Sequence, residues 1–317
     1  ARRSGFDSVW VGHAYLADLA QPMTLFTYDT LTDNSLGTYT IDRSMVPHWT
    51  FSDPGPVLST LGNSVVLGNL VTVVPNHWGF NGNGSYNVPG NWAAGFVPNG
   101  LGADANFLYT ITSPSTVSVN NPVTVSTMLF DNANAYTIAG PAAITLAGPG
   151  GWAASIDVYQ GAHTITAPLV VPGDLWINAQ VGASLSINPS GPPYQWTPGL
   201  LQKWGKGAVA IGSGVVVLGP VDLLDGELEA APGVFAFTGG AINVGPGANL
   251  KASGPVTRHV TGDPTGKITA TGPLAVGLMG SPNGYDFPGT IYVRSYLVGL
   301  MDADLAELNG ARLDGGI

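Results

Sequence analysis

The feature that most constrains the fold is a succession of short apolar segments between residues 106 and 316. In each segment apolar residues alternate with Thr, Ser or Asn, and Gly, Pro or Asn separates it from the next, as in residues 116–119, 144–146 and 184–187. Successive segments start roughly 8–11 residues apart, a spacing typical of all-β folds. Because side chains alternate between the two faces of a strand, the pattern predicts strands that bury one face.

The turns between these segments distinguish one all-β architecture from another. They are single Gly or Pro corners, whereas sandwiches and barrels use hairpin turns of fixed two-residue type. Small corner residues allow coils to stack at the strand spacing of about 4.8 Å. We therefore predict a right-handed parallel β-solenoid without a strict repeat period. The inward row is expected to include Val117, Val119, Ile138, Ile144, Leu146, Ile156, Val158, Ile165, Leu185 and Ile187.

Three regions differ in texture along the chain. Residues 1–75 lack regular glycine turns and are interpreted as an N-terminal β-rich region of unknown fold. Within it, residues 9–19 are compatible with a helix or with a strand and loop, and residues 65–74 predict one or two buried strands. Residues 76–105 form an Asn/Gly/Trp-rich loop linker that leads into the solenoid, which occupies residues 106–317.

Composition excludes several classes of protein. The chain has 317 residues, no Cys, 10 Lys or Arg and 20 Asp or Glu, with a net charge of −10. A disulfide scaffold or thiolate site is thereby excluded, and nucleic acid is not an expected partner because phosphate binding needs basic clusters. No run of about 18 apolar residues is present to span a bilayer. The low charge and missing Cys are common in secreted bacterial surface proteins, so we expect a secreted protein whose leader has been removed.

One segment resembles a known repeat. Residues 200–211, Leu-Leu-Gln-Lys-Trp-Gly-Lys-Gly-Ala-Val-Ala-Ile, are followed by a strand that ends in Gly226-Glu227-Leu228. This segment resembles the autotransporter-associated β-strand repeat, with the pattern L-x-K-x-G-x-G-x-[LV]-x-[LI], a turn and a strand closing on G-x-L. The bulky Trp204 between the lysine and the glycine departs from that pattern.

Two further stretches are similar to secreted β-solenoid proteins of planctomycete-type bacteria, many of which carry a C-terminal sorting tail of the PEP-CTERM kind. They are residues 90–119 and residues 272–306. The resemblance implies export, a β-solenoid and a structural role at the cell surface or outside the cell, and it transfers no catalytic residue. Because the chain stops in mid-pattern at Ile317, we expect a product cut from a longer precursor.

Candidate metal and catalytic residues are few. Asp222, Asp225, Glu227 and Glu229 lie close together, and the last three share a face if they form a strand. A solvated acidic face is the favoured interpretation, with Ca²⁺ binding and a lyase as alternatives. The only mixed cluster suited to a lyase is Arg258-His259 with Asp263 and Lys267. The five histidines are dispersed, so we expect no metal, no cofactor and no catalytic residue.

Aromatic residues are the most informative candidates for contacts. Trp78, Tyr86 and Trp92 lie in the Asn/Gly-rich loops, and Trp152 and Trp204 follow in the solenoid. Exposed tryptophans stack on sugar rings, whereas buried ones cap the ends of coils or form a self-association face. These five residues are therefore possible carbohydrate or self-association contacts.

The function expected from the sequence is that of an extracellular structural protein that associates with itself as a surface or fibre subunit. Residues 291–293 and 296–298 are apolar and predict a strand edge near the C-terminus. The N-terminal region would pair with these coils of the next chain, head to tail, and a filament would propagate. A carbohydrate-binding adhesion module is the alternative, and a polysaccharide lyase is the third.

Overall fold

The computed structural model describes residues 23–27, 57–61, 64–68, 76–191, 194–234, 240–256, 259–276, 288–294, 298–300 and 312–316. By its internal contacts the chain divides into two units, Ala1–Pro75 and Asn76–Ile317. Each unit is considered by itself.

The N-terminal unit contains a small antiparallel sheet. Its strands are β1 (Met23–Thr27), β2 (Val57–Leu61) and β3 (Ser64–Gly68), in the order β1-β3-β2. The apolar run at residues 65–74 thus begins in β3, which is paired on both sides, while residues 69–75 and the segment 9–19 lie outside the described residues. Any strand addition to this sheet would use β1 or β2, because β3 has no open edge.

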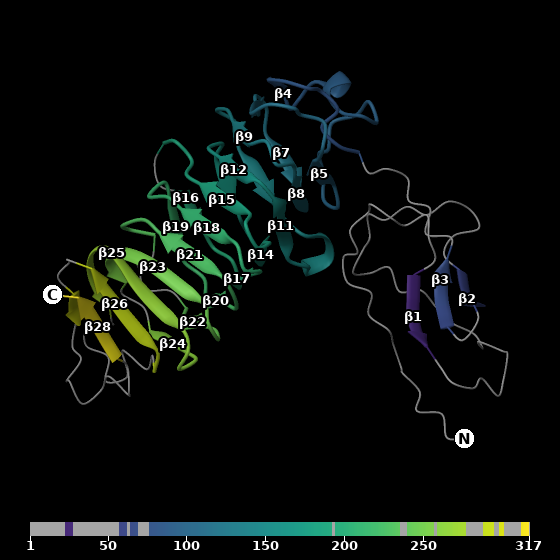
Figure 1. Ribbon diagram of the computed structural model, residues 1–317. Coiled ribbons are helices and arrows are strands. Elements are labelled where there is room, and N and C mark those ends of the chain that lie inside the picture. Colours follow the sequence, from purple (N-terminus) through teal and green to yellow (C-terminus); the bar gives the residue numbers. More distant parts are fainter. Residues whose placement is uncertain are drawn as a thin grey trace. The chain divides into compact units, whose positions relative to one another are not determined.

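The second unit is a parallel β-solenoid, as the sequence predicts (Figure 1). Two long sheets, here called sheet I and sheet II, run along it. The strands of sheet I are β5 (Asp104–Phe107), β8 (Thr127–Asp131), β11 (Ala154–Gln160), β14 (Leu175–Ala179), β17 (Leu201–Trp204), β20 (Val221–Leu223), β22 (Ile242–Val244) and β24 (Val260–Gly262).

Sheet II is the longer of the two. Its strands are β4 (Gly84–Ser85), β6 (Ser115–Ser118), β9 (Tyr136–Ala139), β12 (Ala162–Ile165), β15 (Ser184–Ile187), β18 (Ala208–Ile211), β21 (Glu227–Ala230), β23 (Asn249–Val256), β25 (Lys267–Val276), β26 (Thr290–Arg294), β28 (Arg312–Gly316) and β27 (Val298–Leu300), which pairs with β25. Residues 291–293 lie in β26, which is paired to β25 and β28, so they are not the open edge expected from the sequence.

Short strands close the third side of several coils. They are β7 (Val123–Val125), β10 (Ile144–Leu146) and β13 (Leu169–Val170) in one parallel sheet, and β16 (Tyr194–Trp196) with β19 (Val215–Val217) in another. The chain passes from sheet I to sheet II and then to these strands, so a coil contains up to three strands. Two short 3₁₀ segments, Pro89–Asn91 and Pro149–Gly151, interrupt the described coils.

The core is the inward row of each strand. All ten inward residues expected from the sequence are buried, which confirms the predicted register. Their neighbours in the strands, such as Thr116, Thr137 and Ser186, are half-buried and face outward. Alternation at period two therefore identified the buried face correctly, because each sheet of the solenoid has one face on the core and one outside.

Lys203 in β17 shows why the repeat-like segment combines a lysine with two glycines. The residue is fully buried, and its Nζ donates hydrogen bonds to the carbonyl oxygens of Gly205, of Gly207 at 2.7 Å and of Asp225 at 2.8 Å. Burial lowers the pKa of Lys203 from 10.5 to about 8, although the charges of Asp225 and Glu227 raise it. The lysine ties the turn after β17 to the corresponding turn of the next coil.

Glycine is required at two of these turn positions. Gly205 has a φ of +76°, and a Cβ there would overlap the carbonyl oxygen of Ala179 in the preceding coil. Gly226 has a φ of +69°, and a Cβ there would overlap the ammonium of Lys203. The glycines therefore permit both the left-handed backbone and the close approach that the buried lysine needs.

Candidate functional site

Three of the five aromatic residues singled out from the sequence are buried at the first coil. Trp78, Tyr86 and Trp92 are at most 2% exposed, and the rings of Tyr86 and Trp92 lie 4.8 Å apart in an edge-to-face arrangement. Trp92 Nε1 donates to the carbonyl oxygen of Tyr86 at 2.7 Å, and the Tyr86 hydroxyl donates to that of Pro98 at 2.8 Å. These rings cannot contact a ligand or a second chain.

These rings are buried because they shield the apolar interior of the first described coil from water. Trp92 also contacts Phe107 of β5 at 5.9 Å between ring centroids, and the Trp78 amide donates to the Asn106 carbonyl at 2.8 Å along the edge of that strand. The large rings close the apolar interior at the first coil among the described residues. The segment interpreted as a loop linker thus includes β4 and the start of β5, which pair directly with β6 and β8.

Trp152 and Trp204 are on the surface, with 48% and 37% of each residue exposed. Trp152 precedes β11, and Trp204 ends β17 directly after the buried Lys203. A third tryptophan, Trp176 of β14, is half-buried and faces outward from the neighbouring strand of sheet I. By contrast, Trp196 is fully buried, with its Nε1 donating to the Leu169 carbonyl at 3.2 Å.

The outward positions of β14 and β17 form what we call the tryptophan face: Trp176, Asn178, Gln202 and Trp204. In the parallel register Trp176 lies opposite Gln202, and Asn178 lies opposite Trp204. The tryptophans are therefore diagonal neighbours, one strand and two residues apart, which corresponds to roughly 8 Å between their backbone positions. Each ring has an amide side chain beside it on its own strand and another across from it.

Hydrogen bonds hold the side chain of Asn178, the member of the tryptophan face that lies nearest the core. Asn178, which is 2% exposed, donates from Nδ2 to Asp157 Oδ1 at 3.3 Å. Ser155 Oγ donates to the other carboxylate oxygen of Asp157 at 3.0 Å. Two outward residues of β11 thus support the tryptophan face from the preceding coil, and the rotamer of Asn178 is restricted.

The same side of the solenoid carries carboxyl groups with altered acidity. Burial raises the pKa of Asp104 from 3.8 to about 7; a hydrogen bond from Thr127 lowers it and the charge of Asp157 raises it further. Burial also raises the pKa of Asp131. The pKa of Tyr159 rises to about 12, first through burial and then through the charges of Asp157 and Asp131. Sheet I therefore carries several carboxyl groups, and the raised pKa of Asp104 keeps that carboxyl group partly protonated near neutral pH.

The acidic residues at 222–229 do not form one row. Asp222 faces outward from β20 in sheet I, Asp225 lies in the following turn, and Glu227 and Glu229 face outward from β21 in sheet II. Glu227 forms an ion pair with Lys251 at 2.5 Å. Within the described ranges, no group of three or more His, Asp or Glu side chains is placed to hold a metal ion.

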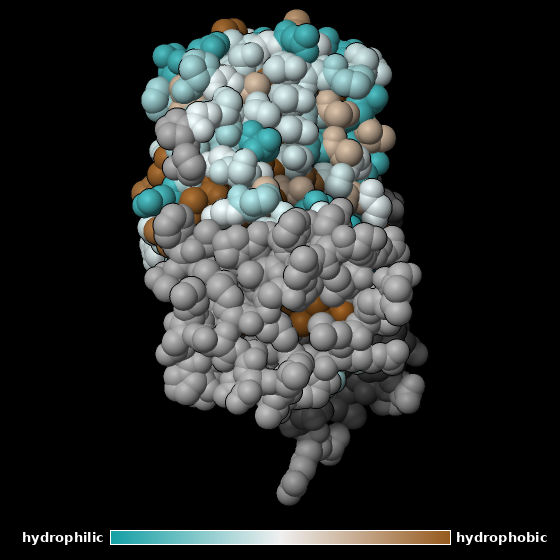
Figure 2. Space-filling model, turned by 90° about the vertical axis from the view of Figure 1, so that its left-hand side faces the viewer, coloured by the Kyte–Doolittle hydropathy of each residue, from teal (hydrophilic) through white to brown (hydrophobic). Residues whose placement is uncertain are grey.

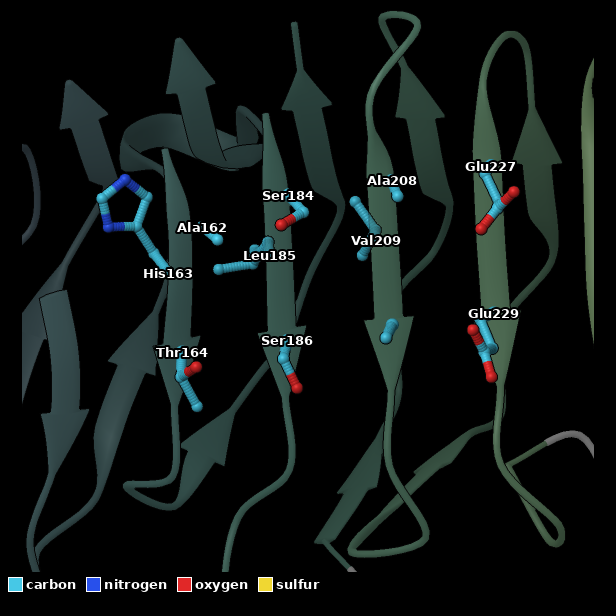
Figure 3. A pocket seen from close by; sticks show the side chains of 11 residues that line it. Ala162, His163, Thr164, Ser184, Leu185, Ser186, Ala208, Val209, Glu227 and Glu229 are labelled. Atoms are coloured by element: carbon cyan, nitrogen blue, oxygen red, sulfur yellow. The ribbon is translucent and has the colours of Figure 1, made fainter. Parts of the chain in front are cut away.

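A shallow groove of about 190 Å³ crosses the outer face of sheet II next to these glutamates. Figure 3 shows the lining side chains on neighbouring strands, with small groups such as Ala162, Ser184 and Ala208 leading to Glu227 and Glu229. The groove has no aromatic ring other than that of His163, which belongs to a core residue. The rest of its lining combines small, hydroxyl and acidic side chains with the apolar Leu185 and Val209.

His163 is a core residue. Its Nδ1 accepts a hydrogen bond from the Tyr136 amide at 3.0 Å, its Nε2 lies 2.8 Å from the Gln160 carbonyl oxygen, and its ring stacks on Phe130. Burial lowers its pKa, so the neutral form is favoured. In the mixed cluster suggested for a lyase, Asp263 instead accepts hydrogen bonds from Thr265, and Arg258 lies outside the described residues.

Comparisons with known proteins found no matching family model, no matching curated protein and no matching solved structure. In the part of the chain that the structure describes, no helix is both long enough and apolar enough to cross a membrane.

Sequence reasoning did not single out Trp176, Asn178 and Gln202 as members of one site. The alternation in residues 175–179 places Trp176 and Asn178 outward, but which strand lies beside them depends on the length of the coil. No local sequence pattern gives the number of residues in a coil, because this number differs from one coil to the next.

Proposed function

We propose that this chain is an extracellular structural protein, secreted or at the cell surface, whose solenoid is a rigid element that associates with other copies. The resemblance of residues 200–230 to an exported repeat supports the location, as do the low charge and the missing Cys. The buried Lys203 gives that resemblance a physical basis, because the fold uses the lysine and both glycines of the pattern together.

The observation that carries self-association is the asymmetry of the two solenoid ends. The aromatic cluster around Trp92 covers the first coil. At the other end β28 is the last strand of sheet II among the described strands, and it is paired only to β26. An unpaired edge accepts another strand, and β1 and β2 each have one edge without a partner strand in the described part of their sheet.

The surface favours association through strand edges over association through a large apolar area. On the coloured part of the face in Figure 2, hydrophilic and near-neutral residues cover most of the area, and apolar residues lie between them in smaller groups.

Sedimentation velocity over a wide concentration range, combined with negative-stain electron microscopy, tests this proposal. We expect the full chain to form elongated oligomers and a chain lacking residues 1–75 to remain monomeric. A full chain that sediments as a monomer at high concentration, or a shortened chain that still polymerises, would contradict the mechanism.

A carbohydrate-binding adhesion module is a second candidate, and the tryptophan face favours it.

The lyase alternative receives no such support. A lyase acting on uronic-acid polymers needs basic groups near the substrate; the outward positions of the described sheet I strands hold Asp but no Lys or Arg, and on sheet II Lys251 is in an ion pair with Glu227.

A further inference from the structure

We infer that the tryptophan face of sheet I binds a neutral polysaccharide chain. Trp176 and Trp204 would stack on the apolar faces of sugar rings, and Gln202 would hydrogen-bond to their hydroxyl groups, while the buried Asn178 supports these side chains from beneath. This inference does not rest on self-association, since the face lies along the side of the solenoid and not at its ends.

The fold does not require tryptophan at the positions of Trp176 and Trp204. An outward position of a parallel solenoid needs only a residue compatible with a strand, and the next outward positions along the sheet hold Asp222 and Asn243. Trp204 also occupies a variable position of the repeat that residues 200–211 resemble. Two outward tryptophans on neighbouring strands together form an apolar platform on which a sugar ring can stack.

Hydrogen bonds from an amide side chain fix the orientation of a sugar, which stacking alone does not do. Polar groups beside an apolar platform fix the orientation of a ligand, and carboxamides both donate to and accept from hydroxyl groups. Asn178 is held by Asp157, which is held in turn by Ser155. The residues beneath the tryptophan face are thus already fixed before a ligand arrives, which lowers the entropic cost of binding.

Charge selects among polysaccharides. The outward positions of the described sheet I strands hold four carboxyl groups and no basic side chain: Asp104, Asp131, Asp157 and Asp222. The nearest basic residues along the chain are Lys203, which is buried in the core, and Lys206, in the turn after β17. A uronic-acid or sulfated polymer would meet like charge, so a neutral polymer is the ligand that fits.

Sheet II provides an internal comparison. Its outward positions from β12 to β21 are small or acidic, and the groove there offers no exposed aromatic ring. Two outer faces of the same solenoid therefore differ in the chemistry they present, and only the face on sheet I combines rings with amides.

Native gel electrophoresis of the full chain in gels containing a soluble polysaccharide tests the inference. The probes are hydroxyethyl cellulose, xyloglucan and galactomannan as neutral polymers and polygalacturonate as the anionic one. We expect at least one neutral polymer to retard the protein and polygalacturonate to have no effect. Trp176→Ala and Trp204→Ala should each weaken binding by about tenfold, and Trp204→Tyr should retain most of it.

Phe96→Ala is the matched control, because Phe96 is an exposed aromatic residue (58%) on a different part of the unit. It should bind like the unaltered chain, and all variants should melt within a few degrees of it. The inference is wrong if no neutral polymer retards the protein, if the Trp176 and Trp204 variants are retarded as strongly as the Phe96 variant, or if polygalacturonate binds equally well.

Discussion

Replacing Lys203 by Met removes the only cation that the described core contains, and the structure sets the cost. Methionine has a similar length but no donor, so the carbonyl oxygens of Gly205, Gly207 and Asp225 lose their hydrogen bonds from Nζ. Each buried acceptor left without a donor costs roughly 1–3 kcal/mol. Against this, the charged lysine is itself destabilised by burial, by about 3 kcal/mol for a pKa lowered from 10.5 to about 8. We expect a net loss of about 3 kcal/mol at pH 7.

The pH dependence provides a second, independent signature. Because the pKa of Lys203 is lower in the folded chain than in the unfolded one, the folded chain releases the proton first and the unfolded chain binds more protons above pH 8. The free energy of unfolding of the unaltered chain therefore rises with pH relative to that of Lys203→Met. The difference grows by about 2 kcal/mol between pH 7 and pH 9.5.

Urea unfolding followed by tryptophan fluorescence at both pH values measures this difference. Lys251→Met is the matched control, since Lys251 is a partly exposed lysine in an ion pair with Glu227, and its loss should cost less than about 1 kcal/mol at either pH. A cost below about 1 kcal/mol for Lys203→Met, or a difference that does not change with pH, would refute the role assigned to the buried ammonium.

Other changes test other parts of the structure. The pKa of Asp104 is about 7 in the folded chain, above the unfolded value of 3.8, so its contribution to stability is complete below about pH 4 and is lost as the pH rises through 7; Asp104→Asn should remove up to about 4 kcal/mol of this dependence in denaturant titrations at pH 4 and pH 8. Ile138→Ala should destabilise the chain by about 2–5 kcal/mol and the neighbouring Thr137→Ala by less than about 0.5 kcal/mol, whereas equal effects would mean that the register of β9 is wrong. EDTA should leave the melting temperature unchanged, and a large drop would reveal a structural metal ion.

The candidate site was only partly accessible to sequence reasoning. Trp204 was identified as one of the recurring tryptophans that could stack on a sugar ring, and the structure places it outward and exposed. For Trp78, Tyr86 and Trp92 the sequence left open whether they form contacts or cap a coil, because Asn/Gly-rich sequence around a tryptophan looks the same whether the loop covers a core or extends into solvent. These rings are buried because they cover the first coil that the structure describes, and this depends on their place in the solenoid.

The sequence by itself determined the class of fold and the inside of each coil. Alternation at period two assigned Ile138, Ile156 and Leu185 to the core without any knowledge of their neighbours, because the face of a strand is decided locally.

Only the tertiary structure decided which coil lies against which. The distance along the chain between register partners ranges from 18 residues, for Ile242 and Val260, to 33, for Gly84 and Val117. No fixed period can therefore be read from the sequence. The pairing of Trp176 with Gln202, and of Asn178 with Trp204, follows from these unequal coil lengths, so the tryptophan face exists only once the coils are stacked.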